Sequence, residues 1–158
     1  MAAFNEVIVG LAEQAGAFLQ KRGLKLITIE SCTGGGLAYA VTQVPGSSAW
    51  FENGLITYSN DSKTRLLHIP SALLEKKGAV SESVARLMAE NALCERVITL
   101  SITGIAGPSG GTPQKPVGTV WIARAGLGQT IAQHYLFSSN RQSIREQAII
   151  AALELLLS

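Results

Sequence analysis

The sequence predicts an α/β fold: a single-domain layered sandwich in which helices flank a mixed β-sheet. Segments with helical periodicity alternate with short β-branched runs along the whole chain, which is typical of layered α/β proteins. The runs at residues 117–124 and 130–137 are joined by the short segment Ala125–Gln129, so we expect a hairpin that adds an antiparallel pair to the sheet. A length of 158 residues with 47% apolar content fits one domain, residues 1–158, with a sizeable core.

The composition argues against several classes of protein. Charged residues make up 15% of the chain and the net charge is +2, without a basic stripe, so nucleic acid is not favoured as a partner. No apolar segment has the length of a membrane span, and no signal-peptide pattern occurs. Cys32 and Cys94 give no disulfide framework, and with His68 and His134 they form no closely spaced set of zinc ligands. We therefore expect a cytoplasmic protein without membrane contact, metal or cofactor.

The first half of the chain begins with an amphipathic helix. Apolar residues recur at helical spacing from Phe4 onward, and Gly23 follows the end of the helix at Arg22. A strand is expected over residues 50–58, with Phe51, Leu55 and Ile56 as core positions. The other elements predicted in this half are a strand over residues 24–29 and helices over residues 36–44, 62–67 and 71–77.

The second half contains the hairpin and the closing helix. Ser81 is expected to cap a helix that runs to about Cys94, and residues 96–103 form a short, strongly apolar and β-branched run that predicts a buried strand. The last helix is predicted over residues 141–157. Its expected inward face consists of Ile144, Ala148, Ala151, Ala152 and Leu155.

Two glycine-rich loops carry the main chemical signal. The first, Glu30–Gly36, follows the strand at residues 24–29, and the second, Thr103–Pro113, follows the strand at residues 96–103. In open α/β sheets ligands bind outside the ends of strands, so we expect the two loops to converge on one crevice. Neither loop contains a P-loop or a dinucleotide-binding glycine motif.

The first loop has the layout of a strand-to-helix elbow. Its glycines let the backbone approach a ligand closely and leave amide groups free to point at an anion. One interpretation makes Ser31 or Thr33 the N-cap of the next helix. The other places Glu30, Ser31 and Thr33 in a pocket floored by the amides of Gly34 and Gly35. Both interpretations can hold, because a cap and an anion site use the same N–H groups.

Six segments, taken together, resemble the CinA C-terminal domain family. They occur in the family's order and cover nearly the whole chain, so the set is specific even though each segment is short. The resemblance implies a stand-alone member, without the N-terminal domain to which some members are fused. The segments are Glu30-Ser31-Cys32-Thr33-Gly34-Gly35, residues 53–60 with Lys63, Gly78-Ala79-Val80-Ser81, residues 103–108, residues 115–120, and Arg141 with Arg145.

The resemblance implies a nicotinamide-nucleotide amidase, which converts nicotinamide mononucleotide and water to nicotinate mononucleotide and ammonia. Amide hydrolysis needs a nucleophile, a base, an acid for the leaving ammonia and donors for the oxyanion. Ser31 is the expected nucleophile, and Lys63 or Tyr58 is the expected base, because a buried lysine can have a lowered pKa. Thr103 is expected to hold the amide or to complete a proton path. Cys32 is the rival nucleophile, since thiolates are intrinsically more reactive.

Substrate contacts are expected from both loops and from the last helix. Arg141 and Arg145 are four residues apart and share a helix face, so both are expected to bind the phosphate; ordinary surface pairing, for example with Glu146, is the alternative. The amides of residues 32–35 form the expected oxyanion hole. Glu30 is expected to orient the site or to accept ribose hydroxyls, unless it pairs with a basic residue. The other expected contacts are Thr33, Gly34, Gly35, Gly104, Ala106 and Gly107.

Two other classes of function stay open at this point. A non-catalytic module that binds a nucleotide would use the same glycine loops without needing Ser31 and Lys63. A competence-related interaction role is suggested by the family's name, although no basic or repetitive segment supports contact with DNA. The apolar composition and the family resemblance also predict a homodimer or a higher homo-oligomer.

Overall fold

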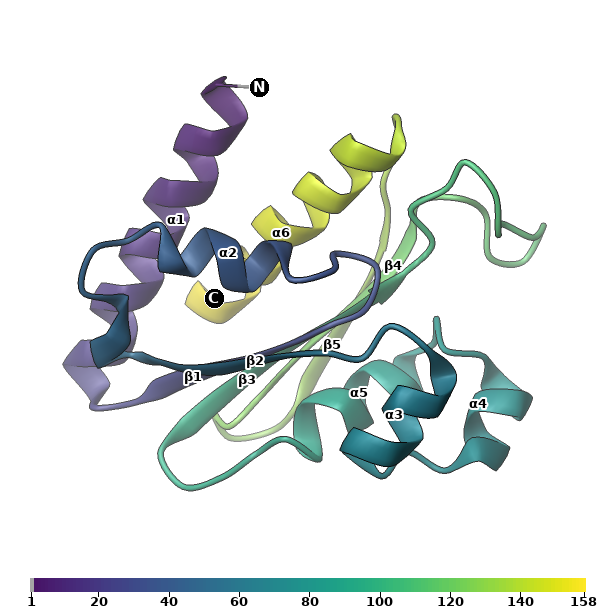
Figure 1. Cartoon of the computed structure of the whole chain (residues 1–158), viewed down its shortest axis with the longest axis horizontal. Coiled ribbons are helices and arrows are strands. Elements are labelled where there is room, and N and C mark those ends of the chain that lie inside the picture. Colours follow the sequence, from purple (N-terminus) through teal and green to yellow (C-terminus); the bar gives the residue numbers. More distant parts are fainter. Residues whose placement is uncertain (1) are drawn as a thin grey trace.

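The protein folds around a five-stranded mixed sheet with the strand order β2-β1-β3-β4-β5 (Figure 1). The computed structural model describes residues 2–158, with side chains from Glu6 onward, so the predicted core position Phe4 lies outside the described side chains. Strands β1, β2 and β3 run parallel, whereas β4 is antiparallel to both β3 and β5. The predicted mixed sheet and its hairpin are confirmed. The strands are β1 (Lys25–Glu30), β2 (Phe51–Ile56), β3 (Val97–Gly104), β4 (Thr119–Ala125) and β5 (Ile131–Leu136).

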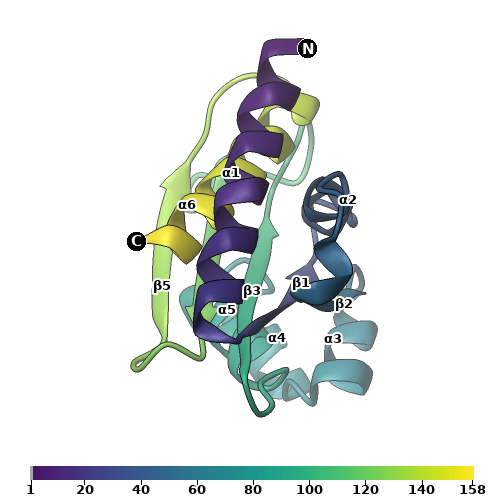
Figure 2. The ribbon, with the colours of Figure 1, turned by 90° about the vertical axis from the view of Figure 1, so that its left-hand side faces the viewer.

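Helices cover both faces of the sheet, which confirms the layered sandwich. One layer consists of α1 (Ala2–Arg22), α2 (Gly36–Thr42) and α6 (Arg141–Leu157) (Figures 1 and 2). The other consists of α3 (Asn60–Leu67), α4 (Ser71–Lys77) and α5 (Glu82–Glu90). A 3₁₀ turn at Ser47–Ala49 was not predicted. None of the helices in residues 2–158 is both long enough and apolar enough to cross a membrane.

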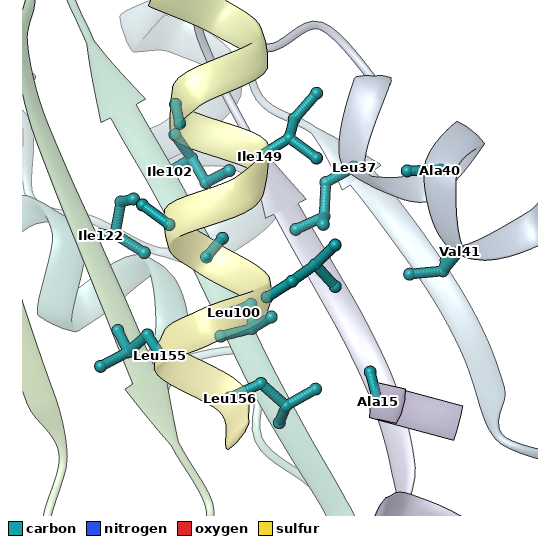
Figure 3. Packing of buried hydrophobic residues seen from close by; sticks show 14 of the residues in the cluster. Ala15, Leu37, Ala40, Val41, Leu100, Ile102, Ile122, Ile149, Leu155 and Leu156 are labelled. Atoms are coloured by element: carbon teal, nitrogen blue, oxygen red, sulfur yellow. The ribbon is translucent and has the colours of Figure 1, made fainter. Parts of the chain in front are cut away.

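The central strand β3 is buried on both faces. Leu100 and Ile102 pack in the core between the sheet and α6 (Figure 3). On the opposite face the hydroxyls of Thr99, Ser101 and Thr103 donate hydrogen bonds of 2.7–2.9 Å to backbone carbonyls of α5 and of the segment before it. These bonds pair the three hydroxyls, which are buried between β3 and the helices on this face.

The structure differs from the prediction at a few positions. Ile56, predicted as a core residue, is 52% exposed, because β2 is an edge strand that the flanking layers cover incompletely. Helix α3 begins at Asn60 rather than residue 62, since the Ser59 side chain accepts a hydrogen bond from the Ser62 amide and caps the helix earlier. Helix α5 ends at Glu90, before the predicted end near residue 94.

The parallel strands bring three sequence-distant segments to one edge of the sheet. Strands β1, β2 and β3 share a direction, so their carboxyl ends lie at the same edge. Ser31 follows β1 directly, Tyr58 lies just after β2, and Gly104 ends β3. This edge is where an open α/β sheet binds ligands.

Candidate active site

A pocket of about 270 Å³ opens at this edge of the sheet, and both glycine-rich loops line it, as the sequence predicted. Its wall combines the turn after β1, the segment between β2 and α3, the loop after β3 and the first turn of α6. The predicted site residues that line the pocket are Ser31, Tyr58, Lys63, Thr103, Gly104, Ala106, Gly107 and Arg141. Cys32, Ala79, Val80, Ile105, Ser109 and Gly110 complete it.

Ser31 is held in a tight turn between β1 and α2. Its amide donates to the carbonyl of Ile102 on β3 at 2.9 Å, and its carbonyl accepts from the Gly34 amide at 3.1 Å. Gly34 and Gly35 have φ values of 59° and 95°, a left-handed conformation that glycine adopts without steric cost. The turn leaves Ser31 9% exposed, at the pocket wall. A nearly buried serine with a fixed backbone is well positioned for chemistry.

Glu30, rather than Ser31 or Thr33, caps helix α2. Its carboxylate accepts hydrogen bonds from the amides of Leu37 at 2.8 Å and Ala38 at 3.0 Å, and the side chain is fully buried. A carboxylate at a helix N-terminus satisfies free amides and opposes the helix dipole favourably. Of the predicted roles, this position supports that of an orienting carboxylate and argues against both a contact with ribose hydroxyls and a pairing with a basic residue.

Replacing Glu30 by glutamine is expected to lower the free energy of unfolding by roughly 2 kcal/mol, because an amide NH₂ group cannot accept the second α2 hydrogen bond. Urea unfolding at neutral pH measures the effect. The matched control is Glu52→Gln, since Glu52 forms an ion pair with Lys25 in which both side chains are over 40% exposed, and its loss should change little. Unchanged stability and a raised KM in the Glu30→Gln variant would contradict the capping role and support a contact between Glu30 and the ribose hydroxyls.

Lys63 is fully buried, although lysines are rarely found inside proteins. It projects from α3, and its Nζ lies 3.0 Å from Ser31 Oγ, 2.6 Å from the Thr57 carbonyl and 3.3 Å from the Tyr58 carbonyl. It forms no ion pair with any carboxylate of residues 6–158. The serine hydroxyl is thus the only side chain among these hydrogen-bond partners.

Burial lowers the pKa of Lys63 from 10.5 to about 8, because the charged form loses its hydration; the neighbouring Cys32 opposes the shift by raising the pKa. A neutral amine has two N–H donors and one lone pair. Two donors match the two carbonyls, so the lone pair remains for the Ser31 hydroxyl proton. The geometry therefore suits proton transfer from Ser31 to Lys63.

Tyr58 lies at the pocket mouth, but its phenol does not meet Lys63. Lys63 contacts the Tyr58 carbonyl, whereas the Tyr58 hydroxyl accepts a hydrogen bond from Arg141 at 3.2 Å. Tyr58 is 59% exposed. The expectation that the Tyr58 phenol relays the serine proton while held against the ammonium of Lys63 is wrong in this geometry. Lys63 is left as the base candidate in contact with Ser31.

Thr103 and Cys32 line the same pocket as Ser31. The Thr103 hydroxyl donates to the Ala79 carbonyl at 2.9 Å, so its lone pairs remain available to accept from a ligand. Burial raises the pKa of the Cys32 thiol to about 11, which keeps it in its weakly nucleophilic protonated form. Within residues 2–158 the Cys32 backbone amide donates to no backbone carbonyl, although it interacts with its own thiol, and it directly follows the nucleophile candidate.

Four other predicted contacts, three of them in the turn itself, do not line the pocket. Thr33 is fully buried, and its carbonyl accepts a hydrogen bond from the Arg145 guanidinium at 3.0 Å. Gly34, Gly35 and Arg145 do not line the pocket either. Arg145 lines a separate open cleft of about 610 Å³ along α6, which shares Arg141 with the pocket. Both arginines therefore line one cleft, as their spacing predicted, but only Arg141 also lines the pocket that contains Ser31.

Sequence reasoning missed several pocket residues. Ala79 and Val80 lay within one of the family-like segments, which was a usable signal, and Ser109 and Gly110 lay in the predicted second loop. The Thr57 carbonyl, which holds Lys63, had no signal because a backbone acceptor is the same at every residue. Within the described residues, no group of three or more His, Cys, Asp and Glu side chains is placed to hold a metal ion.

Comparisons with known proteins agree with this architecture. The family model "CinA C-terminal domain" matches residues 9–158. A Pseudomonas putida protein named "Nicotinamide-nucleotide amidohydrolase PncC" is 45% identical over 152 residues, which is 95% of each chain. The protein of the same name from Escherichia coli K12 is 45% identical over 94% of this chain and 92% of its own. The crystal structure of "competence/damage inducible protein CihA" from Agrobacterium tumefaciens superposes with a TM-score of 0.92 at 37% identity, covering 96% of this chain and 94% of that one. The chain therefore belongs to the CinA C-terminal domain family.

Proposed function

We propose that this protein is a nicotinamide-nucleotide amidase that hydrolyses nicotinamide mononucleotide to nicotinate mononucleotide and ammonia. The observation that carries the proposal is the 3.0 Å contact between Lys63 Nζ and Ser31 Oγ at the wall of the pocket. The names of the relatives from Pseudomonas putida and Escherichia coli support the choice of substrate.

In the first half of the reaction the neutral Lys63 amine takes the proton of the Ser31 hydroxyl. The serine oxygen attacks the carboxamide carbon, and the Cys32 amide is a donor for the oxyanion that forms. When the tetrahedral intermediate collapses, the C–N bond breaks and the Lys63 ammonium gives its proton to the departing nitrogen. Ammonia leaves, an ester joins the nicotinoyl carbon to Ser31, and Lys63 is neutral again.

In the second half a water molecule takes the place of the ammonia. Lys63 accepts a proton from the water as its oxygen attacks the ester carbon. Collapse of this intermediate breaks the bond to Ser31 Oγ, and the Lys63 ammonium returns a proton to the serine oxygen. The product is the nicotinate mononucleotide carboxylic acid, which ionises on release. Both halves of the reaction therefore use Lys63 as the base.

The pH dependence of kcat/KM is expected to follow the neutral fraction of Lys63, whose pKa is about 8. Protonation as the pH falls removes the base, so kcat/KM should decrease about tenfold per pH unit well below about pH 8 and level off above about pH 9. Initial rates of ammonia release measure the profile, with circular dichroism as the control for folding at each pH. A rate that stays constant between about pH 6 and pH 9 would contradict the role of Lys63.

The proposed activity is tested by mixing purified protein with nicotinamide mononucleotide and measuring ammonia and nicotinate mononucleotide. We expect both products in equal amounts. Binding without turnover would favour the alternative of a non-catalytic nucleotide-binding module. The absence of both binding and turnover would favour the competence-related interaction role.

We also propose that the protein forms a homodimer or a higher homo-oligomer. Several large apolar side chains are more than half exposed in the single chain, which supports a surface covered by another copy. They are Val7, Tyr39, Ile56, Tyr58, Leu66 and Leu136. Light scattering coupled to size-exclusion chromatography tests the assembly, and a mass near 16.6 kDa would overturn it.

A further inference from the structure

We infer that Lys115 is a positioning residue that holds together two parts of the pocket wall, the loop after β3 and the segment after α4. This role rests on the proposed function, because it concerns how the pocket keeps the shape that binds the substrate. Lys115 lies within the family-like segment at residues 115–120 and does not itself line the pocket. It therefore acts on the substrate only through the two segments that it joins.

A single charge-assisted hydrogen bond joins the two segments. The Lys115 ammonium donates to the carbonyl of Lys77, the last residue of α4, at 2.6 Å. The last carbonyls of a helix have no partner within the helix, and a cation there interacts favourably with the helix dipole. A Cβ atom on Gly78 would lie 3.0 Å from the same ammonium, so glycine at this position leaves room for it. Lys115 forms no ion pair within residues 6–158, so no carboxylate competes for the ammonium.

The segment after α4 enters the pocket wall directly beyond this contact. Ala79 and Val80 line the pocket, and within residues 2–158 their amides donate to no backbone carbonyl. Side chains hold the segment instead. The Thr103 hydroxyl donates to the Ala79 carbonyl at 2.9 Å, and the Ser81 hydroxyl donates to the Gly78 carbonyl at 2.9 Å. The Lys115 contact adds the point of attachment at the end of α4.

Lys115 itself belongs to the returning arm of the loop after β3. The Thr112 amide donates to the Lys115 carbonyl at 2.9 Å, and the Lys115 amide donates to the Thr112 hydroxyl at 3.0 Å, so a turn fixes the backbone of the lysine. The returning arm packs against the outgoing arm, since a Cβ atom on Gly107 would collide with the Val117 side chain. The outgoing arm contributes residues 104–107, 109 and 110 to the pocket wall. A displacement of Lys115 is therefore passed on to this wall.

The reacting groups lie outside the two segments that Lys115 joins. Ser31 follows β1 and Lys63 projects from α3, and they contact each other without Lys115. Without the contact between Lys115 and Lys77, a smaller fraction of the free enzyme has both parts of the wall in place, and the apparent affinity falls by that fraction. Bound substrate restores the wall before the chemical step. Lys115 therefore affects KM rather than kcat.

Kinetics of ammonia release separate this role from a general one. Lys115→Met, which keeps the length of the side chain but has no donor, is expected to raise KM for nicotinamide mononucleotide roughly five- to thirtyfold and to keep kcat within about twofold. Lys115→Arg retains a cationic donor and is expected to return KM to within about threefold of the wild type. Lys76→Met, which removes an exposed lysine next to the contacted carbonyl, is the matched charge control and should change neither constant. An unchanged KM in Lys115→Met, a loss in kcat alone, or no recovery in Lys115→Arg would overturn the positioning role.

Amide hydrogen exchange, followed by NMR, tests the same contact without turnover. The Gly78 amide donates to the Leu74 carbonyl and the Thr112 amide to the Lys115 carbonyl, each at 2.9 Å, so they report on the two segments that the lysine joins. In Lys115→Met both amides are expected to exchange at least about fivefold faster than in the wild type, whereas the Ser31 amide exchanges at the same rate. Unchanged exchange of both would overturn the inference even in an active amidase. Conversely, faster exchange of both in a protein that releases no ammonia would keep the role of Lys115 in the pocket wall and refute the proposed function.

Discussion

A Lys63→Met variant is expected to lose at least about 10³-fold in kcat for ammonia release and, at neutral pH, to be more stable than the wild-type protein. The activity is lost because methionine cannot accept the Ser31 proton, while the side chain has a similar length and fits the same buried site. No other basic side chain among residues 6–158 donates a hydrogen bond to Ser31.

The gain in stability follows from the pKa of Lys63. Folding lowers this pKa from 10.5 to about 8, so below about pH 8 the folded protein contains a buried ammonium that costs about 3 kcal/mol. The unfolded chain binds more protons between these two pKa values, and the cost therefore decreases as the pH rises through this window. The Lys63→Met variant also loses the hydrogen bonds to the carbonyls of Thr57 and Tyr58, which reduces its gain in stability by about 1 kcal/mol. We expect a net gain of about 2 kcal/mol at pH 7, which disappears above about pH 10.5.

Two controls accompany this variant. Lys63→Arg keeps the positive charge but has too high a pKa to act as a base, so it should be as inactive as Lys63→Met without the gain in stability. Lys76→Met removes an exposed lysine of α4 and should change neither property. Urea unfolding at pH 7 and at pH 10.5 measures stability. A Lys63→Met enzyme with more than about a tenth of the wild-type kcat would exclude Lys63 as the base.

Ser31→Ala is expected to lower kcat by roughly 10⁴-fold or more, with little change in the affinity for nicotinamide mononucleotide. The Ser31 hydroxyl lies 3.0 Å from Lys63 Nζ, and the ester intermediate cannot form without it. The residual rate would come from substrate binding and the backbone donors alone. Substrate affinity, measured by calorimetry on the inactive variant, separates loss of chemistry from loss of binding.

Cys32→Ala is the matched comparison, since Cys32 is adjacent in sequence and lines the same pocket. Its thiol is expected to stay protonated, because burial raises its pKa to about 11, and the backbone amide is retained in the alanine variant. We expect Cys32→Ala to keep kcat within about tenfold of the wild type. If Cys32→Ala were inactive and Ser31→Ala active, the roles of the two side chains would be reversed.

Hydrophobic periodicity and helix-capping residues were sufficient to predict most of the fold. Helix α6 has the predicted bounds, Arg141–Leu157, because its apolar stripe is continuous and the Asn140 side chain accepts a hydrogen bond from the Ser143 amide at its start. Ile56 was misplaced because strand position depends on tertiary structure: the same apolar residue is buried in a central strand and exposed at an edge.

Most residues of the pocket were predicted from the sequence, but their contacts with one another were predicted only in part. Ser31 and Lys63 were found from the resemblance, but their contact depends on how α3 packs at the sheet edge, which local sequence does not determine. The ribose contact of Glu30 and the contact of the Tyr58 phenol with Lys63 were not found, because the partner of a polar side chain depends on tertiary structure. Arg141 and Arg145 line one cleft, as a spacing of four residues on a helix predicts, but the hydrogen bond from the Arg145 guanidinium to the Thr33 carbonyl could not be predicted because it joins residues far apart in the sequence.

Labelling with diisopropyl fluorophosphate tests most directly whether Lys63 activates Ser31, since it requires neither substrate nor turnover. The serine oxygen displaces fluoride from phosphorus, and mass spectrometry locates the adduct. We expect one adduct, on the peptide that contains Ser31, formed at a rate that rises with pH with an apparent pKa near 8, and absent from Lys63→Met. An active enzyme that remains unlabelled at Ser31, or labelling that proceeds equally fast in Lys63→Met, would contradict the account.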